Sequence, residues 1–345
     1  MNRTLSAFAV CGLLMTALCG CRNNIDISDN TAFTRDLFAM DTFMSVRAYG
    51  KNASAALDSS EKLISSLEKE LSVTLPESDI SRINSSGEPV RVSGNTAAII
   101  DAAIRYGSLT DGALDITLYP VLRAWGFTTG EYRIPDSHEL SELLEKVDYR
   151  QIQSEDSTVS VPENVMIDLG ALAKGYTSDA VAQIMREKGV SSGLINLGGN
   201  VQTVGTKPDG SLWRVAVRNP YSPDTDMCVV EIADKAVITS GTYERYFTGE
   251  DGKNYWHILD PSTGCPADNG VVSATIIGES GIMCDALSTA LFVAGTEKAV
   301  SYWQSGNEDF DMILVTNDRR MICTDGISDA FSSSCSMPVE VIHRA

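Results

Sequence analysis

The stretch that decides the fold runs from Gly281 to Gly295 and reads GIMCDALSTALFVAG. This composition predicts a buried helix of about eleven residues that ends at Gly295, because helices commonly stop at glycine. Asp285 and Thr289 are four residues apart, so a carboxylate and a hydroxyl lie on one face of the helix. Cys284 points about 100° away around the helix and is assigned to the core.

The Asp285 carboxylate needs a partner, because a carboxylate that is buried unpaired costs much free energy. No Lys or Arg lies within this helix. Two oxygen donors at this spacing, with no imidazole or thiolate beside them, suit a hard cation such as Mg2+. The alternative interpretation is that Asp285 caps a helix or accepts a hydrogen bond from a nearby backbone N–H. The segment by itself leaves both interpretations open.

The composition is that of an acidic globular chain. It has 345 residues, of which 43% are hydrophobic, and a formal net charge of −19. This length is enough to bury a sizeable core, in one large domain or two. No basic stretch is present that would neutralise phosphates, which argues against nucleic acid as a partner.

The N-terminus predicts export. A short apolar run from Leu5 to Leu18, too short to span a bilayer, leads to Leu18-Cys19-Gly20-Cys21. We expect residues 1–20 to be a signal peptide and Cys21 to carry a lipid anchor. Residues 21–32 are polar and suit a flexible tether. The alternative is an ordinary cleaved signal peptide without a lipid.

The remaining chain, residues 33–345, alternates helical and strand-like patterns. It predicts one compact catalytic domain of α/β to α+β type, with mixed sheets flanked by helices. Five cysteines follow Cys21 without CxxC spacing, so neither a disulfide framework nor a zinc site is indicated. Helices are expected at 53–71, 96–109 and 137–147, and strands at 33–49, 165–168, 193–200, 213–218, 228–239 and 271–277, with a hairpin over 312–324.

Two other segments suggest chemistry. The predicted strand at 165–168 leads through small residues into a helix that stops at Gly189, an arrangement in which helix N–H groups can meet phosphate oxygens. Lys174 adds a point charge there. The alternatives are that the small residues serve only close packing and that Lys174 is solvated. His257 lies on a strand that leads into the strong turn signal Asp260 to Gly264.

Seven short motifs then occur in one order along the chain. They are AMDT (39–42), ALDIT (113–117), DLGALAKGY (168–176), INLGGN (195–200), SGTYER (240–245), HILDPSTG (257–264) and DALSTA (285–290). Together they resemble the ApbE family, the FAD:protein FMN transferases, many of which are exported lipoproteins. The resemblance runs from about Phe33 to Gly295 and so covers most of the mature chain.

The resemblance implies an enzyme that binds FAD and Mg2+. It would pass the FMN half of FAD to a Thr or Ser hydroxyl of an acceptor protein through a phosphoester bond and release AMP. The residues that it implies are, for Mg2+, Asp285, Thr289 and the carbonyl of Ala171; for FAD, Met40, Ala113, Leu114, Asp115, Lys174 and Leu259; and, beside the reacting phosphate, His257. Residues 240–245 would shape the same pocket.

This sequence departs from the family pattern at three positions. Asp41 stands where the family commonly has Gly, so it needs backbone angles that L-residues tolerate less well. Ser288 stands where some members carry a second carboxylate. Thr74 stands where some members have an aromatic or polar residue for the flavin.

The general base is left open between His257 and a carboxylate farther from the phosphate, and His257 also suits a residue that only packs against the flavin. Two other functions use the same residues: an Mg2+-dependent FAD pyrophosphatase that gives FMN and AMP, and a non-catalytic FAD-binding lipoprotein. A Ser/His/Asp hydrolase is not indicated, because only one of the three histidines, His257, lies in a promising loop. The expected acceptors are exported subunits of membrane redox complexes. In residues 269–275, Ser273 stands where family acceptor sequences have the Gly before Ala-Thr, and the segment is a predicted strand, so the chain is not expected to flavinylate itself.

Overall fold

The computed structural model describes residues 30–344. The predicted signal peptide, Cys21 and most of the predicted tether therefore lie outside the described residues. The first strand begins at Ala32, one residue before the expected start at Phe33, and Thr31 O accepts a hydrogen bond from Gly50 N at 3.0 Å.

The described residues form eight α-helices and seventeen β-strands. The helices are α1 (Ala53–Leu71), α2 (Asp79–Ser85), α3 (Gly94–Leu109), α4 (Tyr119–Ala124), α5 (Ser137–Leu144), α6 (Ala173–Glu187), α7 (Gly281–Ala294) and α8 (Thr296–Gln304). The strands are β1 (Ala32–Ala39), β2 (Thr42–Tyr49), β3 (Val90–Arg91), β4 (Gln153–Glu155), β5 (Thr158–Ser160), β6 (Ser192–Leu197), β7 (Asn200–Gly205), β8 (Trp213–Arg218), β9 (Asp226–Ile232), β10 (Ala236–Gly241), β11 (Tyr246–Thr248), β12 (Asn254–Trp256), β13 (Val271–Gly278), β14 (Asp311–Thr316), β15 (Met321–Thr324), β16 (Phe331–Ser333) and β17 (Val339–Ile342).

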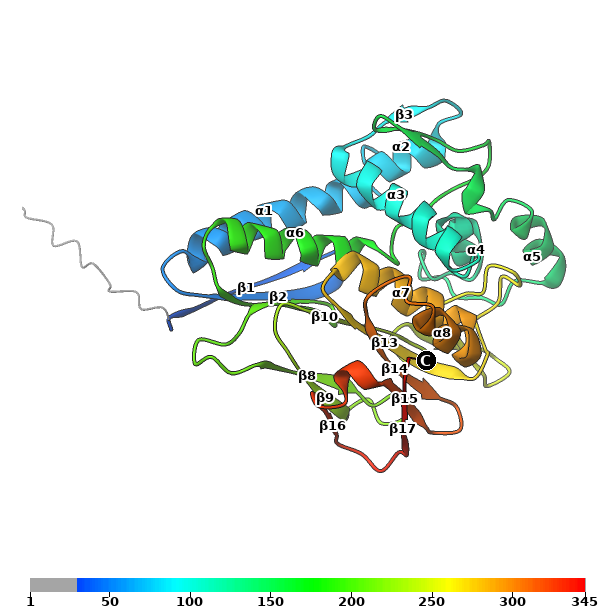
Figure 1. Cartoon of the computed structure of the whole chain (residues 1–345). Helices are drawn as coiled ribbons and strands as arrows, with labels where there is room; N and C mark the ends of the chain where they lie inside the picture. Colours follow the sequence, from blue (N-terminus) through cyan, green and yellow to red (C-terminus); the bar gives the residue numbers. More distant parts are fainter. Residues whose placement is uncertain (1–29, 345) are drawn as a thin grey trace, which may run out of the picture.

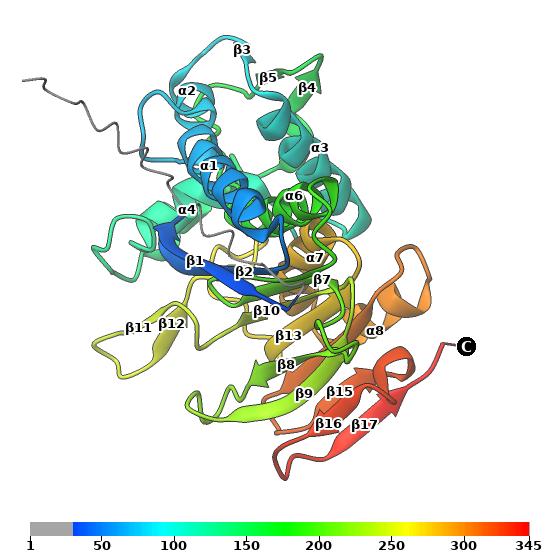
Figure 2. The same cartoon turned by 90° about the vertical axis from the view of Figure 1, so that its left-hand side faces the viewer.

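A nine-stranded sheet forms the middle layer, in the order β1-β2-β6-β7-β10-β13-β14-β15-β17. Its neighbouring strands are antiparallel, except that β15 and β17 are parallel. Helices α1, α6 and α7 cover one face, and the small sheet β16-β9-β8 covers the other (Figures 1 and 2). This arrangement confirms the predicted fold class, a compact mixture of helices and mixed sheets.

The two helices with the clearest sequence patterns form where they are expected. Helix α1 covers the predicted 53–71 and buries its apolar face, which includes Leu57, Ile64 and Leu67. Helix α7 has fourteen residues rather than about eleven and is buried almost all round. Gly295 ends it with a φ of 83°, a conformation that glycine adopts without strain.

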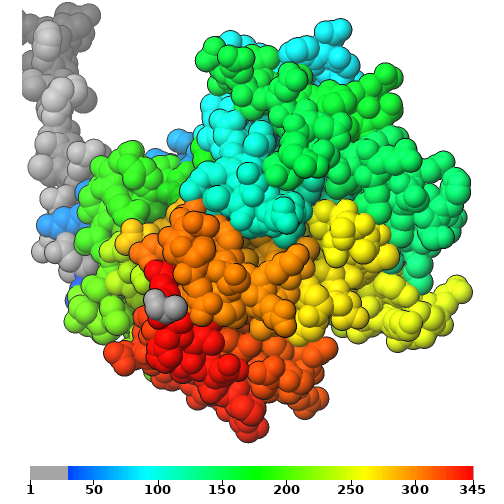
Figure 3. Space-filling model, turned by 45° about the vertical axis from the view of Figure 1, so that its right-hand side comes forward, coloured from blue at the N-terminus to red at the C-terminus, as the bar shows by residue number. Residues whose placement is uncertain are grey.

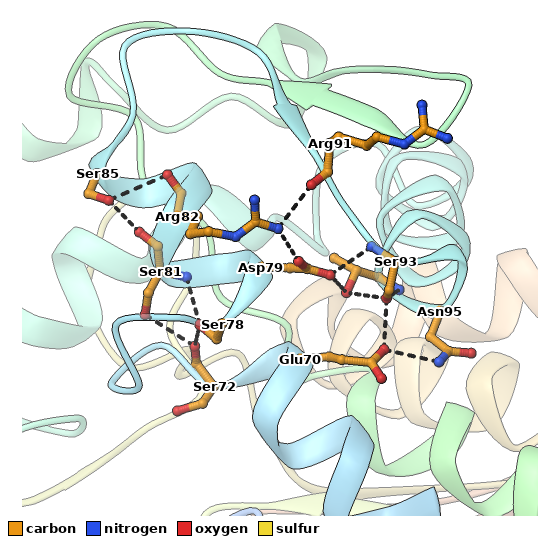
Figure 4. Close-up of polar contacts among 11 residues, drawn as sticks. Glu70, Ser72, Ser78, Asp79, Ser81, Arg82, Ser85, Arg91, Ser93 and Asn95 are labelled. Atoms are coloured by element: carbon orange, nitrogen blue, oxygen red, sulfur yellow. Dashed lines mark hydrogen bonds and ion pairs between the residues drawn. The ribbon is translucent and has the colours of Figure 1, made fainter.

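A polar network ties α1, α2 and α3 together (Figure 4). The buried Asp79 carboxylate accepts hydrogen bonds from Ser93 N and the Thr96 hydroxyl, both at 2.8 Å, and pairs with Arg82. Burial raises the pKa of Asp79, but these bonds outweigh it, so the pKa is lowered overall. Ser93 also donates to Glu70 at the end of α1, at 2.7 Å. The network fixes the three helices beside the cleft described below.

The predicted strand at 165–168 is wrong, because this segment is extended but has no neighbouring strand. The Asn84 side chain takes the place of one: Ile167 N donates to its Oδ1 at 2.7 Å, and its Nδ2 donates to Ile167 O at 2.8 Å. Asp168 N donates to Ile116 O at 2.9 Å. A side chain from α2 therefore satisfies main-chain groups that the hydrophobic pattern assigned to a sheet.

Three further expectations need correction. The single strand expected at 228–239 is two strands, because a turn with Asp234 at a φ of 51° sends β9 and β10 into different sheets. The strand expected at 193–200 ends at Leu197, where Gly198 and Gly199 have positive φ and form a tight turn into β7. The bent segment expected after Ala113 contains a short 3-10 helix and α4, which Pro120 can begin.

None of the helices within residues 30–344 is long and apolar enough to cross a membrane. In the space-filling view of Figure 3, the orange residues around α8 lie between the C-terminal strands in red and the cyan part of the chain near α3.

Candidate active site

A cleft of about 940 Å³ opens where the β1–β2 turn, the β6–β7 turn and the starts of α6 and α7 meet. All ten residues that the sequence predicts for the site line this one cleft. They are Met40, Ala113, Leu114, Asp115, Ala171, Lys174, His257, Leu259, Asp285 and Thr289. The sequence separates them by up to 249 positions, so the tertiary fold brings them together.

Asp285 has two protein partners, and neither is a cation in direct contact. Its Oδ2 accepts from Gly175 N at 2.8 Å and its Oδ1 accepts from Asn200 Nδ2 at 2.9 Å, with the side chain 4% exposed. Burial raises the pKa of Asp285, while Lys174, the Gly175 N–H and Asn200 oppose that rise. Asp285 therefore accepts a hydrogen bond from a backbone N–H, as the alternative interpretation expects, and this bond does not exclude a cation. Each oxygen still has unused lone-pair capacity, because a carboxylate has about four acceptor sites.

A chain of hydroxyls orients Thr289. Ser288 Oγ donates to the carbonyl of Asp285 at 2.9 Å, so it accepts from Ser240 Oγ, which is also 2.9 Å away. Ser240 Oγ is 3.3 Å from Thr289 Oγ1 and can accept the Thr289 proton. This direction of donation leaves the lone pairs of Thr289 Oγ1 free to bind a cation.

The donors in the cleft fit a hard cation. Across the part of the chain that the structure describes, no three His, Cys, Asp or Glu side chains gather as a metal site. A cation here would be held by oxygens: the Asp285 carboxylate, the Thr289 hydroxyl and the carbonyl of Ala171. Mg2+ accepts this set, because it commonly takes one or two protein carboxylates and fills its other positions with water and substrate phosphate oxygens.

Positive charge lies on the same side of the cleft. Lys174 interacts favourably with Asp285 and with the half-buried Asp168. Burial raises the pKa of Asp168, while the Gly170 N–H, Arg245 and Lys174 oppose that rise. The start of α6 offers fewer donors than expected. Its Gly175 N–H donates to Asp285 and its Ala173 N–H donates to Leu169 O. These two groups are not available to a phosphate.

His257 directly follows β12, so it lies one residue beyond the strand on which the sequence places it. Its Nδ1 is 3.1 Å from Arg245 O, and its backbone N–H donates to the same oxygen at 3.0 Å. A carbonyl only accepts, so Nδ1 carries the proton and Nε2 keeps its lone pair. Burial, together with Arg245 and Lys174, lowers the pKa of His257 to about 4. The ring is therefore neutral at physiological pH.

The β1–β2 turn brings Met40 and Asp41 to the cleft. Both residues have positive φ, 48° and 63°, which bears out the expectation that Asp41 needs backbone angles that favour glycine. Met40 N donates to Glu68 Oε1 at 2.9 Å. The Asp41 carboxylate reaches across the cleft to Arg245 Nη2 at 3.2 Å. A glycine at position 41 could not form this ion pair.

Asp115 holds its own segment in place. Its Oδ1 accepts from the N–H and the hydroxyl of Thr117, at 2.8 and 2.6 Å, and its Oδ2 accepts from Tyr149 N at 2.9 Å. Burial raises its pKa in spite of these bonds. The cleft is also lined by three apolar residues, Ala113, Leu114 and Leu259.

Two residues of the cleft were quoted within motifs but not assigned a role. Asn200 orients Asp285, and Asp168 brings a second carboxylate near Lys174 and Arg245. Asp168 follows the buried Ile167 and Asn200 follows the Gly198-Gly199 turn, and these local features are the signals that could have marked them. The side chain that each one meets depends on the fold.

Comparisons with known proteins agree with this site. Residues 40–314 match the ApbE family. The FAD:protein FMN transferase of Vibrio cholerae serotype O1 is 33% identical over 266 residues, which are 75% of this chain and 79% of that protein. The protein of the same name from Treponema pallidum is 30% identical over 341 residues, 92% of this chain and 94% of the relative.

Solved structures show the same fold. The ApbE protein from Thermotoga maritima superposes with a TM-score of 0.81 at 32% identity, over 87% of this chain and 99% of its own. The flavin transferase ApbE from Vibrio cholerae gives 0.77 at 28% identity, over 87% of this chain and 100% of its own. The chain therefore belongs to the ApbE family.

Proposed function

We propose that this protein is an FAD:protein FMN transferase that moves FMN from FAD to a Thr or Ser hydroxyl of an acceptor protein and releases AMP. One observation carries the proposal: the acid–alcohol pair on α7, Lys174 and His257 line a single cleft in a chain of the ApbE family. Relatives that match most of their own length carry this activity in their names.

The cleft suits a dinucleotide. Its volume of about 940 Å³ is at the upper end of ordinary ligand sites, and it has both apolar walls and charged groups. We assign Met40, the segment 113–115 and Leu259 to the FAD site and Lys174 to the diphosphate. Asp285, Thr289 and the Ala171 carbonyl would hold Mg2+. When bound, Mg2+ supplies positive charge that offsets the charge of the diphosphate and orients it.

The transfer exchanges the phosphoanhydride bond of the FAD diphosphate for a phosphoester bond to the acceptor. The acceptor hydroxyl oxygen forms a bond to the phosphorus of the FMN half, and the bond from that phosphorus to the bridging oxygen breaks, so that AMP leaves with the electron pair. The hydroxyl proton passes to Nε2 of His257, which the Nδ1 bond to Arg245 O leaves unprotonated. Negative phosphate beside His257 raises its pKa from about 4, which makes it a better base when FAD is bound.

We further propose that residues 1–20 direct export, that Cys21 carries a lipid anchor, and that 33–345 act as one catalytic unit on the outer side of a bacterial membrane. This placement rests on the sequence Leu18-Cys19-Gly20-Cys21 after a short apolar run. Exported subunits of membrane redox complexes are the acceptors that share this compartment.

The test is a transfer assay. Purified protein is mixed with FAD, Mg2+ and an acceptor domain, and flavin fluorescence is followed through denaturing electrophoresis. We expect a fluorescent acceptor band, and none with EDTA or with the variant Asp285→Ala. Asp234→Ala is the matched control, because Asp234 also accepts from a backbone N–H, Gly205 N at 2.9 Å, but does not line the cleft.

Two other outcomes identify the competing functions. FAD consumed to free FMN and AMP without a labelled acceptor would support the pyrophosphatase. Tight FAD binding without any turnover would support a flavin-binding lipoprotein. Either result, obtained with an acceptor that a relative does label, contradicts the proposed transfer.

A further inference from the structure

Helices α6 and α7 begin with the same spacing, Gly-x-x-x-Asp, and each Asp binds the other helix. Asp285 of α7 accepts from Gly175 N of α6 at 2.8 Å. Asp179 of α6 accepts from Gly281 N of α7 at 2.7 Å. We call these four residues the reciprocal clasp. The two helices lie side by side over the central sheet (Figure 1).

Only glycine fits at both glycine positions of the clasp. A Cβ on Gly175 would lie 2.3 Å from Gly281 O, and a Cβ on Gly281 would lie 2.6 Å from Gly175 O. The two backbones therefore touch at the level of the clasp, and neither helix start can shift without breaking a bond of the other. The position of Asp285 is tied in this way to that of Asp179.

The two carboxylates differ in how many donors they accept. Asp179 takes four: Gly281 N and Gln202 Nε2 on Oδ1, both at 2.7 Å, and Ile282 N and Ser280 Oγ on Oδ2, at 3.0 and 3.3 Å. Asp285 takes two, one on each oxygen. Because a carboxylate has about four acceptor sites, Asp179 is saturated and Asp285 retains half its capacity.

We propose that Asp179 is the positioning residue of the cation site: it anchors the start of α7 so that Asp285 presents its unused lone pairs to the ion. This inference rests on the proposed function, since the ion is the one proposed there. Asp179 does not line the cleft and acts through α7. Its four donors include two N–H groups of the α7 start, which lack partners within the helix.

The variant Asp179→Asn tests this role. An amide keeps the shape but turns one acceptor oxygen into a donor that faces N–H groups, so α7 loses part of its anchor. The readout is binding of Mn2+, a hard cation that occupies the same kind of oxygen site, to the full mature chain with FAD, followed by the loss of the free-ion signal in electron paramagnetic resonance. We expect affinity to fall about 10-fold, as for residues that orient metal ligands.

The melting temperature and two other variants separate positioning from folding. Asp234→Asn removes a carboxylate that accepts from a backbone N–H outside the cleft, and should leave Mn2+ affinity unchanged. Gln202→Leu removes one of the four donors to Asp179, and should weaken Mn2+ binding in the same direction by a smaller factor. If Asp179→Asn does not fold, the Mn2+ affinity of Gln202→Leu tests the inference in its place.

A lower melting temperature with unchanged Mn2+ affinity, measured well below the transition, would overturn the inference and leave Asp179 as a structural cap. Wild-type protein that binds FAD but no Mn2+ would overturn the cation site of the proposed function, and the inference with it. The two failures are distinguished by the wild-type titration.

Discussion

At the scale of single residues, the site depends on which polar groups have all their hydrogen bonds satisfied. The Asp115 carboxylate accepts hydrogen bonds from Thr117 and Tyr149, so it shapes the cleft but has few lone pairs left for a ligand. Asp285 accepts one hydrogen bond on each oxygen and keeps the rest. Two acids of one cleft therefore have different roles, and their hydrogen-bond partners decide which role each has.

His257 gives a prediction about stability and pH. Its pKa is about 4 in the folded protein, against 6.5 for an ordinary histidine. Below pH 6.5 the unfolded chain takes up a proton that the folded chain refuses, so acid favours unfolding, and this contribution is lost progressively from pH 6.5 down to about 4. The full shift corresponds to about 3 kcal/mol.

We expect His257→Gln to remove this part of the pH dependence. The measurement is the free energy of unfolding in urea at pH 7.5 and at pH 5, for both proteins and without FAD. Because other titratable groups also contribute to the pH dependence, the comparison is the difference between wild type and variant at each pH. Equal slopes for the two proteins between these pH values would contradict the lowered pKa.

At the scale of secondary-structure elements, the segment before α6 shows how a side chain can replace a strand. Asn84 makes both hydrogen bonds of Ile167, which is fully buried. A few residues later the chain reaches Ala171 and Lys174 at the cleft. A pattern of apolar residues marks this segment as buried, but it does not reveal which group pairs with its backbone.

We predict that Asn84→Ala destabilises the protein by about 2 to 4 kcal/mol, because it leaves a buried N–H and a buried C=O without partners. Urea unfolding at pH 7 measures the change. Asn219→Ala is the control, since the Asn219 side chain accepts one exposed hydrogen bond, from Tyr221 N, and its loss should change stability by less than about 0.5 kcal/mol. Equal effects of the two substitutions would argue against the role given to Asn84.

At the scale of the whole molecule, the three layers place the cleft where loops from distant parts of the chain meet. The helix layer supplies Asp285, Thr289 and Lys174, and the sheet layer supplies Asn200 and Ser240. The described residues contain no helix that could cross a membrane. The proposed attachment to a membrane rests on the sequence Leu18-Cys19-Gly20-Cys21.

We predict that Cys21→Ala moves the protein from the membrane fraction to the soluble fraction of a bacterial host. A single diacylated cysteine supplies two buried chains, which is enough for stable anchoring, and the variant has neither. Fractionation, followed by mass measurement of the mature N-terminus, checks this. Wild-type protein that is soluble and carries no lipid would support the ordinary cleaved signal peptide.

The sequence by itself determined the family, the fold class, the two main helices and the ten residues expected at the site. It could do so because apolar periodicity and short ordered motifs are local properties of the chain, which can be recognised without knowing which distant residues are in contact. The helix end at Gly295 and the positive φ of Asp41 were expected from residue type at each position, which is also a local property of the sequence.

Only the tertiary structure decided how those residues are used. It showed that Asn84 replaces a strand, that the chain at 228–239 divides between two sheets, and that Asp285 is held by Gly175 and Asn200 rather than by a basic residue. The reciprocal clasp joins Gly175 and Gly281, which are 106 residues apart in the sequence. The partner of a buried polar group is set by whatever the fold packs against it, and no local pattern contains that information.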